Sequence, residues 1–273
     1  MKKLMMTLAA GLFATAVVAE VTSGNVVGYQ TITVTNGYNM LACNFDGVAG
    51  AEGMTFDQLI PGTTPGLTKG AGVSFADNIM VFNPLTKGYV TYFLWYSTKA
   101  AQSANNNKWV LSQTVPAAER LNSGDPFWFN SRNTNQTVQI PATFLGQVPT
   151  ESAKSFSITN GYNMLSCLFA ADWDPNILGT NFWAGAPAKK GAGVSFADNI
   201  MVFNPTTKGY VTYFLWYSTK AAQSANNYKW VLSQTVVAPT NFVKTGAGVW
   251  YNYRETNNVA GFTIPVDRPY TLE

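Results

Sequence analysis

Two aspartates, Asp77 and Asp198, occupy the same place in two copies of the sequence FADNI. A pair of carboxylates could serve as the acid and the base of a glycoside hydrolase, provided that both faced one sugar-binding cleft. These two lie in separate repeats, each beside the start of an expected strand, so we interpret them as turn-capping residues. A hydrolase that relies on carboxylates alone is therefore only the third of our functional hypotheses.

A second acidic stretch, DWDPN, has the spacing with which a calcium-binding loop begins, and its candidate ligands are Asp172, Asp174 and Asn176. Such a loop needs glycine at its sixth position and glutamate at its twelfth, where this chain has Ile177 and Trp183. We interpret the stretch as an ordinary acidic turn and expect neither a metal nor another cofactor.

The chain contains no histidine, which removes the commonest general base and the usual protease and zinc constellations. It also lacks nucleophile-elbow, phosphate-loop and dinucleotide motifs, so we predict a protein that is not an enzyme. Its two cysteines, Cys43 and Cys167, could form a disulfide in an oxidising compartment. We favour two separate buried side chains, because equivalent core positions in sister units usually lie far apart.

Aromatic side chains are the remaining candidates for a binding site. Flat rings beside Asn and Gln side chains can stack on sugar faces and bond sugar hydroxyls. Eight residues fit this description: Trp95, Tyr96, Trp109, Trp128, Trp216, Tyr217, Trp230 and Trp250. Aromatic residues that alternate along strands more often belong to a core, so a bivalent carbohydrate-binding module is our alternative hypothesis.

A long internal repeat organises the chain. Residues 69–115 match residues 190–236 at all but two of 47 positions, and shorter matches extend the likeness toward both ends. We predict two homologous units, unit 1 over residues 20–147 and unit 2 over residues 148–273. The segments that differ most, 46–68 in unit 1 and 170–189 in unit 2, are where the units could differ in task.

The pattern within each unit is typical of β-structure. The sequence DNIMVF-NPLTKG-YVTYFLWY predicts a hairpin, and further short apolar runs are separated by Gly, Pro and Asn. Thr55 and Gln58 stand at capping-box spacing, so we expect one short helical turn there. The fold class is therefore all-β: two tandem sandwich or barrel-like units of short antiparallel strands.

The strand YVTYFLWY, residues 89–96, is apolar on both of its faces. A sandwich strand normally has one face in water, so this strand has more apolar surface than one core can use. We expect the sister unit, a loop, another copy of the protein or a ligand to cover the surplus.

Residues 1–19 have the pattern of a bacterial signal peptide, with Lys2 and Lys3 ahead of an apolar run that ends in Val17-Val18-Ala19. We expect export to the periplasm, the cell surface or the medium, and no transmembrane helix. Removal of this leader would leave a net charge of about +1, which argues against a nucleic-acid partner.

The segment that follows the leader reads Asn25-Val26-Val27-Gly28-Tyr29, and aromatic segments surround Trp109 and Trp230. In these features the chain resembles a group of functionally uncharacterised secreted bacterial proteins. The resemblance implies export and a β-architecture, and it carries over no catalytic residues. Our leading hypothesis is an exported structural or surface-assembly protein that acts through aromatic β-surfaces on itself, on other surface components or on polysaccharide.

Overall fold

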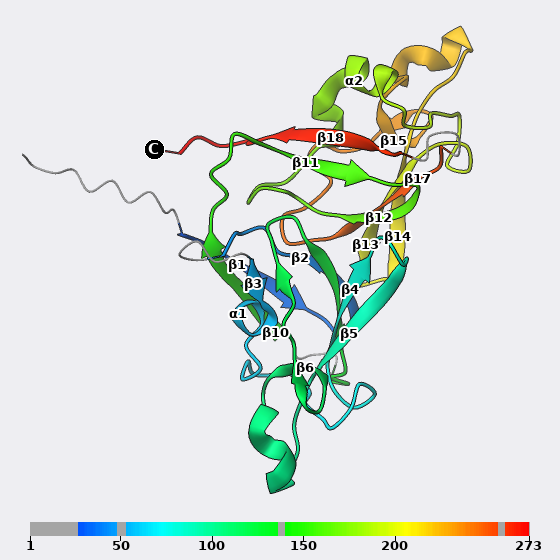
Figure 1. Ribbon diagram of the computed structural model, residues 1–273. Coiled ribbons are helices and arrows are strands. Elements are labelled where there is room, and N and C mark those ends of the chain that lie inside the picture. The colour runs from blue at the N-terminus through cyan, green and yellow to red at the C-terminus, as the bar shows by residue number, and fades with distance from the viewer. Residues whose placement is uncertain (1–26, 48–52, 136–139, 256–259, 273) are drawn as a thin grey trace, which may run out of the picture.

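The computed structural model of the chain describes residues 27–47, 53–135, 140–255 and 260–272 (Figure 1). The expected signal peptide lies outside the described residues. Strands dominate what is described, and every pair of named strands is antiparallel, which confirms the all-β prediction. None of the helices in this part of the chain has the length and apolar character to cross a membrane.

Each unit contains one six-stranded sheet, and the two sheets have the same strand order. In unit 1 the order is β2 (Gly37–Ala42), β9 (Pro126–Ser131), β4 (Asn78–Asn83), β5 (Gly88–Leu94), β6 (Trp109–Ser112) and β7 (Val115–Pro116). In unit 2 it is β12 (Gly161–Leu165), β17 (Val249–Tyr253), β13 (Asn199–Asn204), β14 (Gly209–Leu215), β15 (Trp230–Ser233) and β16 (Val236–Val237). The prediction of two similar units is thus confirmed.

A two-stranded ribbon forms a second layer over each large sheet. The ribbons are β1 (Val27–Val34) with β10 (Ile140–Gln147), and β11 (Ala153–Ile158) with β18 (Phe262–Asp267). Period-two alternation turns Val34 and Phe144 inward, where they join Phe127 and Phe129 in one buried cluster. Each unit therefore has a sandwich-like core of its own.

Local sequence explains the connections. The Asn83 side chain accepts hydrogen bonds from the backbone N–H groups of Leu85 and Thr86, at 2.9 and 3.1 Å, which closes the predicted β4–β5 turn. Thr55 and Gln58 form the predicted capping box at the start of α1 (Phe56–Leu59).

The chain has more short helices than the single turn we expected. They are η2 (Ala100–Asn105), η3 (Pro175–Leu178), α2 (Gly179–Gly185) and η4 (Ala221–Asn226), and a small sheet pairs β3 (Met54–Thr55) with β8 (Arg120–Leu121). Segments of four to seven residues are too short for helical periodicity to be recognised in the sequence.

The divergent segments do the same packing task in different ways. In unit 1 the buried Trp109 indole donates a hydrogen bond of 2.7 Å to the Ile60 carbonyl, just after α1. In unit 2 the equivalent Trp230 meets Trp183 of α2 edge to face, with ring centroids 5.3 Å apart. Each unit thus closes the same end of its core with its own insertion.

The surplus apolar face of β5 is covered mainly within its own unit. Tyr92 and Leu94 enter the main core, whereas Phe93 and Trp95 form a satellite cluster with Ala76. Tyr89, near the start of the strand, stays partly exposed and lies at the junction with unit 2.

The two units meet face to face, with β4 and β5 close to β13 and β14 (Figure 1). Phe82 packs edge to face on Trp250 at a centroid distance of 5.0 Å, and its equivalent Phe203 packs on Trp128 at 4.9 Å. Such reciprocal contacts between equivalent residues are the mark of a two-fold arrangement. The units are therefore related by a pseudo-two-fold axis, and the sister unit covers part of the aromatic surplus.

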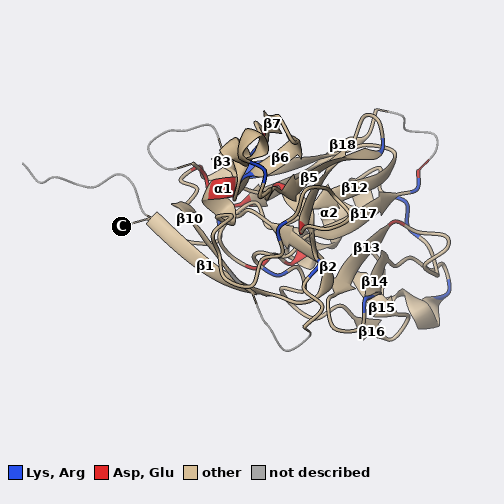
Figure 2. Ribbon diagram, turned by 90° about the horizontal axis from the view of Figure 1, so that it is seen from below, with Lys and Arg blue, Asp and Glu red and all other residues tan. Residues whose placement is uncertain are grey.

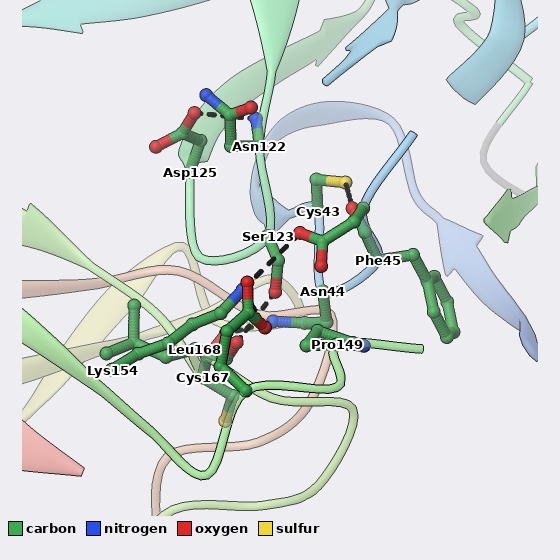
Figure 3. Close-up of polar contacts among 12 residues, drawn as sticks. Cys43, Asn44, Phe45, Asn122, Ser123, Asp125, Pro149, Lys154, Cys167 and Leu168 are labelled. Carbon is green, nitrogen blue, oxygen red and sulfur yellow. Dashed lines mark hydrogen bonds and ion pairs between the residues drawn. The ribbon is translucent and has the colours of Figure 1, made fainter. Parts of the chain in front are cut away.

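Polar contacts join the loops beside this aromatic junction (Figure 3). The Asn44 side chain donates a hydrogen bond to the Cys167 carbonyl and accepts one from the Gly246 N–H. Ser123 donates to the Leu168 carbonyl at 2.7 Å. Because these groups are buried, each pairing removes a desolvation penalty and fixes how the units dock.

Gly246 is one of the tightly packed glycines in this loop contact. Its φ is +78°, and an added Cβ would lie 2.5 Å from Ile32 Cδ1 and 2.8 Å from Gln30 Nε2. The Gln30 side chain donates a 2.9 Å hydrogen bond to the Thr245 carbonyl, so a methyl group here would disturb the contact between units.

We predict that Gly246→Ala lowers the free energy of unfolding by about 2 kcal/mol, from left-handed backbone strain plus a lost hydrogen bond. Gly161→Ala is the matched control for strain alone, since Gly161 has φ +80° and open space around its Cβ position, and should cost about 1 kcal/mol. Gly185→Ala, within α2, should be neutral or stabilising. Urea unfolding measures all three, and equal losses for Gly246→Ala and Gly161→Ala would contradict the role of the contact.

Candidate functional site

The outer face of each six-stranded sheet carries sulfur-containing and aromatic side chains. Across unit 1, Met40, Trp128 and Met80 stand opposite one another in register, while their sequence neighbours turn into the core. In unit 2 the corresponding residues are Met164, Trp250 and Met201. These two faces meet at the pseudo-two-fold axis and form an apolar floor between the units.

Two open hollows flank this contact. The first, of about 550 Å³, is lined by Phe82, Lys87, Tyr89, Gly161, Tyr162, Met201, Tyr210 and Trp250. The second, of about 620 Å³, is lined by Gly37, Tyr38, Met80, Tyr89, Trp128, Phe203, Lys208, Tyr210 and Trp250. The hollows share Tyr89, Tyr210 and Trp250, so we treat them as one junction groove, whose parts each have the volume of a small-ligand site.

Four tyrosines form the walls of the junction groove, and each is between 45% and 49% exposed. Tyr38 leans edge to face on Trp128, and Tyr162 leans in the same way on Trp250, both at 5.9 Å. Tyr89 packs on Phe82 at 5.5 Å, and Tyr210 on Phe203 at 5.4 Å. Buried or partly buried rings thus hold the exposed ones in place before any ligand arrives.

The central tyrosines keep their hydroxyl protons at neutral pH. Burial raises the pKa of Tyr89, and the neighbouring Tyr210 raises it further, while a hydrogen bond from Trp128 works against both. Burial likewise raises the pKa of Tyr210, opposed by a hydrogen bond from Trp250. Each hydroxyl can therefore donate and accept hydrogen bonds at the mouth of the groove.

A lysine from each hairpin turn reaches across the junction. Lys208 Nζ donates hydrogen bonds to the carbonyls of Asn36 and Tyr38, at 2.6 and 3.2 Å, and burial lowers its pKa. Its equivalent, Lys87, donates to the Tyr162 carbonyl at 3.3 Å. No carboxylate is among the described residues that line the groove, and charged residues are sparse along the coloured part of the ribbon in Figure 2.

Of the eight aromatic residues that the sequence analysis predicted as candidates for ligand binding, two line the junction groove. Trp128 and Trp250 form its floor and are 7% and 8% exposed. Trp95 and Trp216 are 3% exposed and donate their indole N–H groups to backbone carbonyls of η2 and η4. Trp109 and Trp230 are fully buried in the main cores, so none of these four presents a ring face to a ligand.

The remaining nominated residues, Tyr96 and Tyr217, lie on the surface away from the groove. Tyr96 is exposed, whereas Tyr217 packs on Tyr228 at a tilt of 42°, with a centroid distance of 5.2 Å. Sequence reasoning missed the four groove tyrosines. A signal did exist, since each follows a glycine within a duplicated segment, as in TNGYNM and TKGYVT.

The weak calcium candidates have structural roles. Asp172 bonds Lys244 at 2.7 Å and the Thr245 N–H at 2.8 Å; burial would raise its pKa, but these bonds lower it overall. Asp174 caps η3, and Asn176 pairs with the Trp230 backbone. Asp172 and Asp174 both line a hollow of about 580 Å³. The described residues nevertheless include no cluster of three side chains that could hold a metal ion.

Asp77 and Asp198 are buried anchors for neighbouring loops. Asp77 accepts hydrogen bonds from the backbone N–H groups of Thr68 and Arg132, at 2.9 and 2.6 Å. Asp198 has matching backbone donors and also accepts a 2.9 Å bond from the Tyr251 hydroxyl, where unit 1 has Phe129. Burial raises the pKa of each carboxyl to about 6, although its hydrogen bonds oppose that shift.

Both cysteines are free and buried, one in each core. The Cys43 thiol donates to the Phe45 carbonyl at 3.1 Å, and the Cys167 thiol donates to the Val243 carbonyl at 3.4 Å. Burial raises the pKa of each thiol to about 12, so neither is a reactive nucleophile at neutral pH.

We predict that acidification from pH 7 to pH 5 stabilises the fold. Asp77 and Asp198 titrate near pH 6 when folded and near 3.8 when unfolded, so the native state binds more protons in this window. The stabilisation that these two carboxyls contribute is fully present below pH 3.8 and is lost as the pH rises through 6. It is on the order of 1–3 kcal/mol per carboxylate. Urea unfolding at several pH values measures the slope, which Asp77→Asn should reduce. A steady loss of stability from pH 7 to pH 5 would refute it.

Comparison with known proteins adds no relative from which a function could be transferred. No family model matches the chain, and neither the curated proteins nor the solved structures that were searched contain a match. The function must therefore be argued from the geometry and chemistry of the junction groove.

Proposed function

We propose that this chain is an exported, non-enzymatic protein that binds a neutral polysaccharide in its junction groove. The observation that carries the proposal is the set of four half-exposed tyrosines around two open hollows, each packed on a buried or partly buried ring. Export rests on the leader pattern of residues 1–19 and on the resemblance to secreted bacterial proteins.

Sugar chains match the groove in both apolar and polar character. A pyranose ring has flat C–H faces that pack on aromatic rings, and hydroxyls at its edge that both donate and accept hydrogen bonds. The tyrosines supply the same combination, since each offers a ring face and a hydroxyl. A rigid ring also loses little conformational entropy when a ligand binds.

The charges of the groove favour a neutral ligand and argue against hydrolysis. Its two lysines direct their ammonium groups toward protein carbonyls of the opposite unit, where they are already hydrogen-bonded. A glycoside hydrolase needs two carboxylates across its cleft, and the described lining residues include none.

We predict that the mature protein binds at least one of cellohexaose, xylohexaose and maltohexaose, and that Tyr89→Ala/Tyr210→Ala weakens this binding at least tenfold. Two lost ring contacts at about 0.5–1.5 kcal/mol each account for that factor. Isothermal titration calorimetry measures the affinity, and Trp128 and Trp250 in the floor give an independent fluorescence signal.

The matched control is Tyr96→Ala/Tyr217→Ala, which removes two equivalent tyrosines outside the groove. It should bind like the unsubstituted protein. The proposal fails if none of the three hexasaccharides binds, or if the control loses binding while the groove variant keeps it.

A second function, self-association into a surface assembly, is favoured by a separate feature. Phe75 and Phe196 are 73% and 69% exposed in identical loops, one in each unit, and each has an exposed valine two residues before it. Exposed rings on a protein whose net charge without the leader is only about +1 favour contacts between copies. Two such loops per chain would allow each molecule to contact two others.

We predict that the sedimentation coefficient of the mature protein rises with concentration, and that Phe75→Ser/Phe196→Ser abolishes the rise. Tyr89→Ala/Tyr210→Ala serves as the control and should still associate. A single monomeric species at all concentrations would exclude this second function without bearing on sugar binding.

A further inference from the structure

The geometry points to a junction groove that holds two polysaccharide segments in opposite directions, one in each hollow, so that a single molecule joins two antiparallel chains. This inference rests on the proposed function and goes further, because it specifies the number and the direction of the bound chains. It follows from the symmetry of the groove.

Most of the contacts that build the groove occur in reciprocal pairs. Lys87 reaches the Tyr162 carbonyl of unit 2, and Lys208 reaches the Tyr38 carbonyl of unit 1. Tyr38 leans on Trp128 as Tyr162 leans on Trp250, at the same centroid distance of 5.9 Å. The equivalent residues Tyr89 and Tyr210 line both hollows, so the pseudo-two-fold axis passes between these two rings.

A two-fold axis through the mouth of the groove reverses every direction in the plane of that mouth. A sugar chain has a direction, from its non-reducing to its reducing end. A chain that threaded both hollows would meet the second set of contacts in reverse order and could match only one of them. Two segments that run in opposite directions meet the same contacts in the same order.

The sizes of the hollows are consistent with separate occupancy. Each has its own outer tyrosine and its own lysine, Tyr162 with Lys87 in one and Tyr38 with Lys208 in the other. Their volumes, about 550 and 620 Å³, are close to each other and lie within the usual range for one ligand. The central pair Tyr89 and Tyr210 would contact both segments.

Joining two chains gives the protein a structural role without self-association. Once one polymer is bound, the second hollow lies beside it and can take a neighbouring antiparallel chain. The monomer would therefore act as a clamp between polysaccharide chains.

The experiment is calorimetric titration of the full mature chain with the hexasaccharide that binds best. We expect two sites per molecule, and one remaining site in Tyr38→Ala and in Tyr162→Ala. Light scattering with the corresponding soluble polymer (hydroxyethylcellulose, xylan or amylose) should rise with the unsubstituted protein. Either single variant should bind the polymer but scatter at least fivefold less light.

The possible outcomes distinguish the binding of two antiparallel chains from the proposed function, which is polysaccharide binding itself. One site per molecule that either single variant weakens means that one chain spans both hollows, which overturns the inference and leaves sugar binding intact. No binding in any titration overturns both. A dimer that Tyr89→Ala/Tyr210→Ala dissociates means that a second copy occupies the groove, which also overturns the inference. Tyr29→Ala, at an exposed position outside the groove, is the control and should retain two sites.

Discussion

The packing of Phe82 on Trp250, and of Phe203 on Trp128, is the constraint on which the rest of the arrangement depends. These edge-to-face contacts set the outer faces of two sheets against each other about a pseudo-two-fold axis. Sheets twist, so two of them that touch along a central line diverge on either side of it. The hollows lie beside the contact in this way, and the tyrosines of neighbouring strands line them.

Duplication within one chain explains how such a groove can form from nearly identical parts. In a two-fold contact each segment is used twice, once on each side of the axis, so the turn lysines Lys87 and Lys208 perform the same task for opposite units. The regions away from the axis are free to differ. Trp109 and Trp230 are supported by unrelated insertions, and Tyr251 bonds Asp198 where Phe129 has no hydroxyl.

Much of the fold could be predicted from the sequence, because its determinants are local. The Asn83 turn, the Thr55 capping box and the period-two alternation of β1 each depend on residues within a few positions of one another. The repeat itself is evident when the two halves of the sequence are compared. The short helices were missed, because four to seven residues carry too little pattern.

The candidate site could be predicted from the sequence only in part, for a physical reason. Trp95 and Trp128 look alike in the sequence, yet a loop of its own unit covers Trp95, while Trp128 meets the sister unit. Tyr38 and Tyr89 come from different strands, and Phe203 and Lys208 of the other unit line the opposite side of their hollow. No local pattern contains a surface that exists only after two units dock.

The covalent link between the units adds something that a symmetric dimer could not have. In a dimer of identical chains both hollows must remain the same, whereas here each can change alone. The groove already departs from symmetry, because Trp250 lines both hollows and Trp128 only one. A tandem chain can therefore keep the shared Tyr89–Tyr210 centre while one outer end adapts to a different sugar, so that the two bound chains need not be chemically identical.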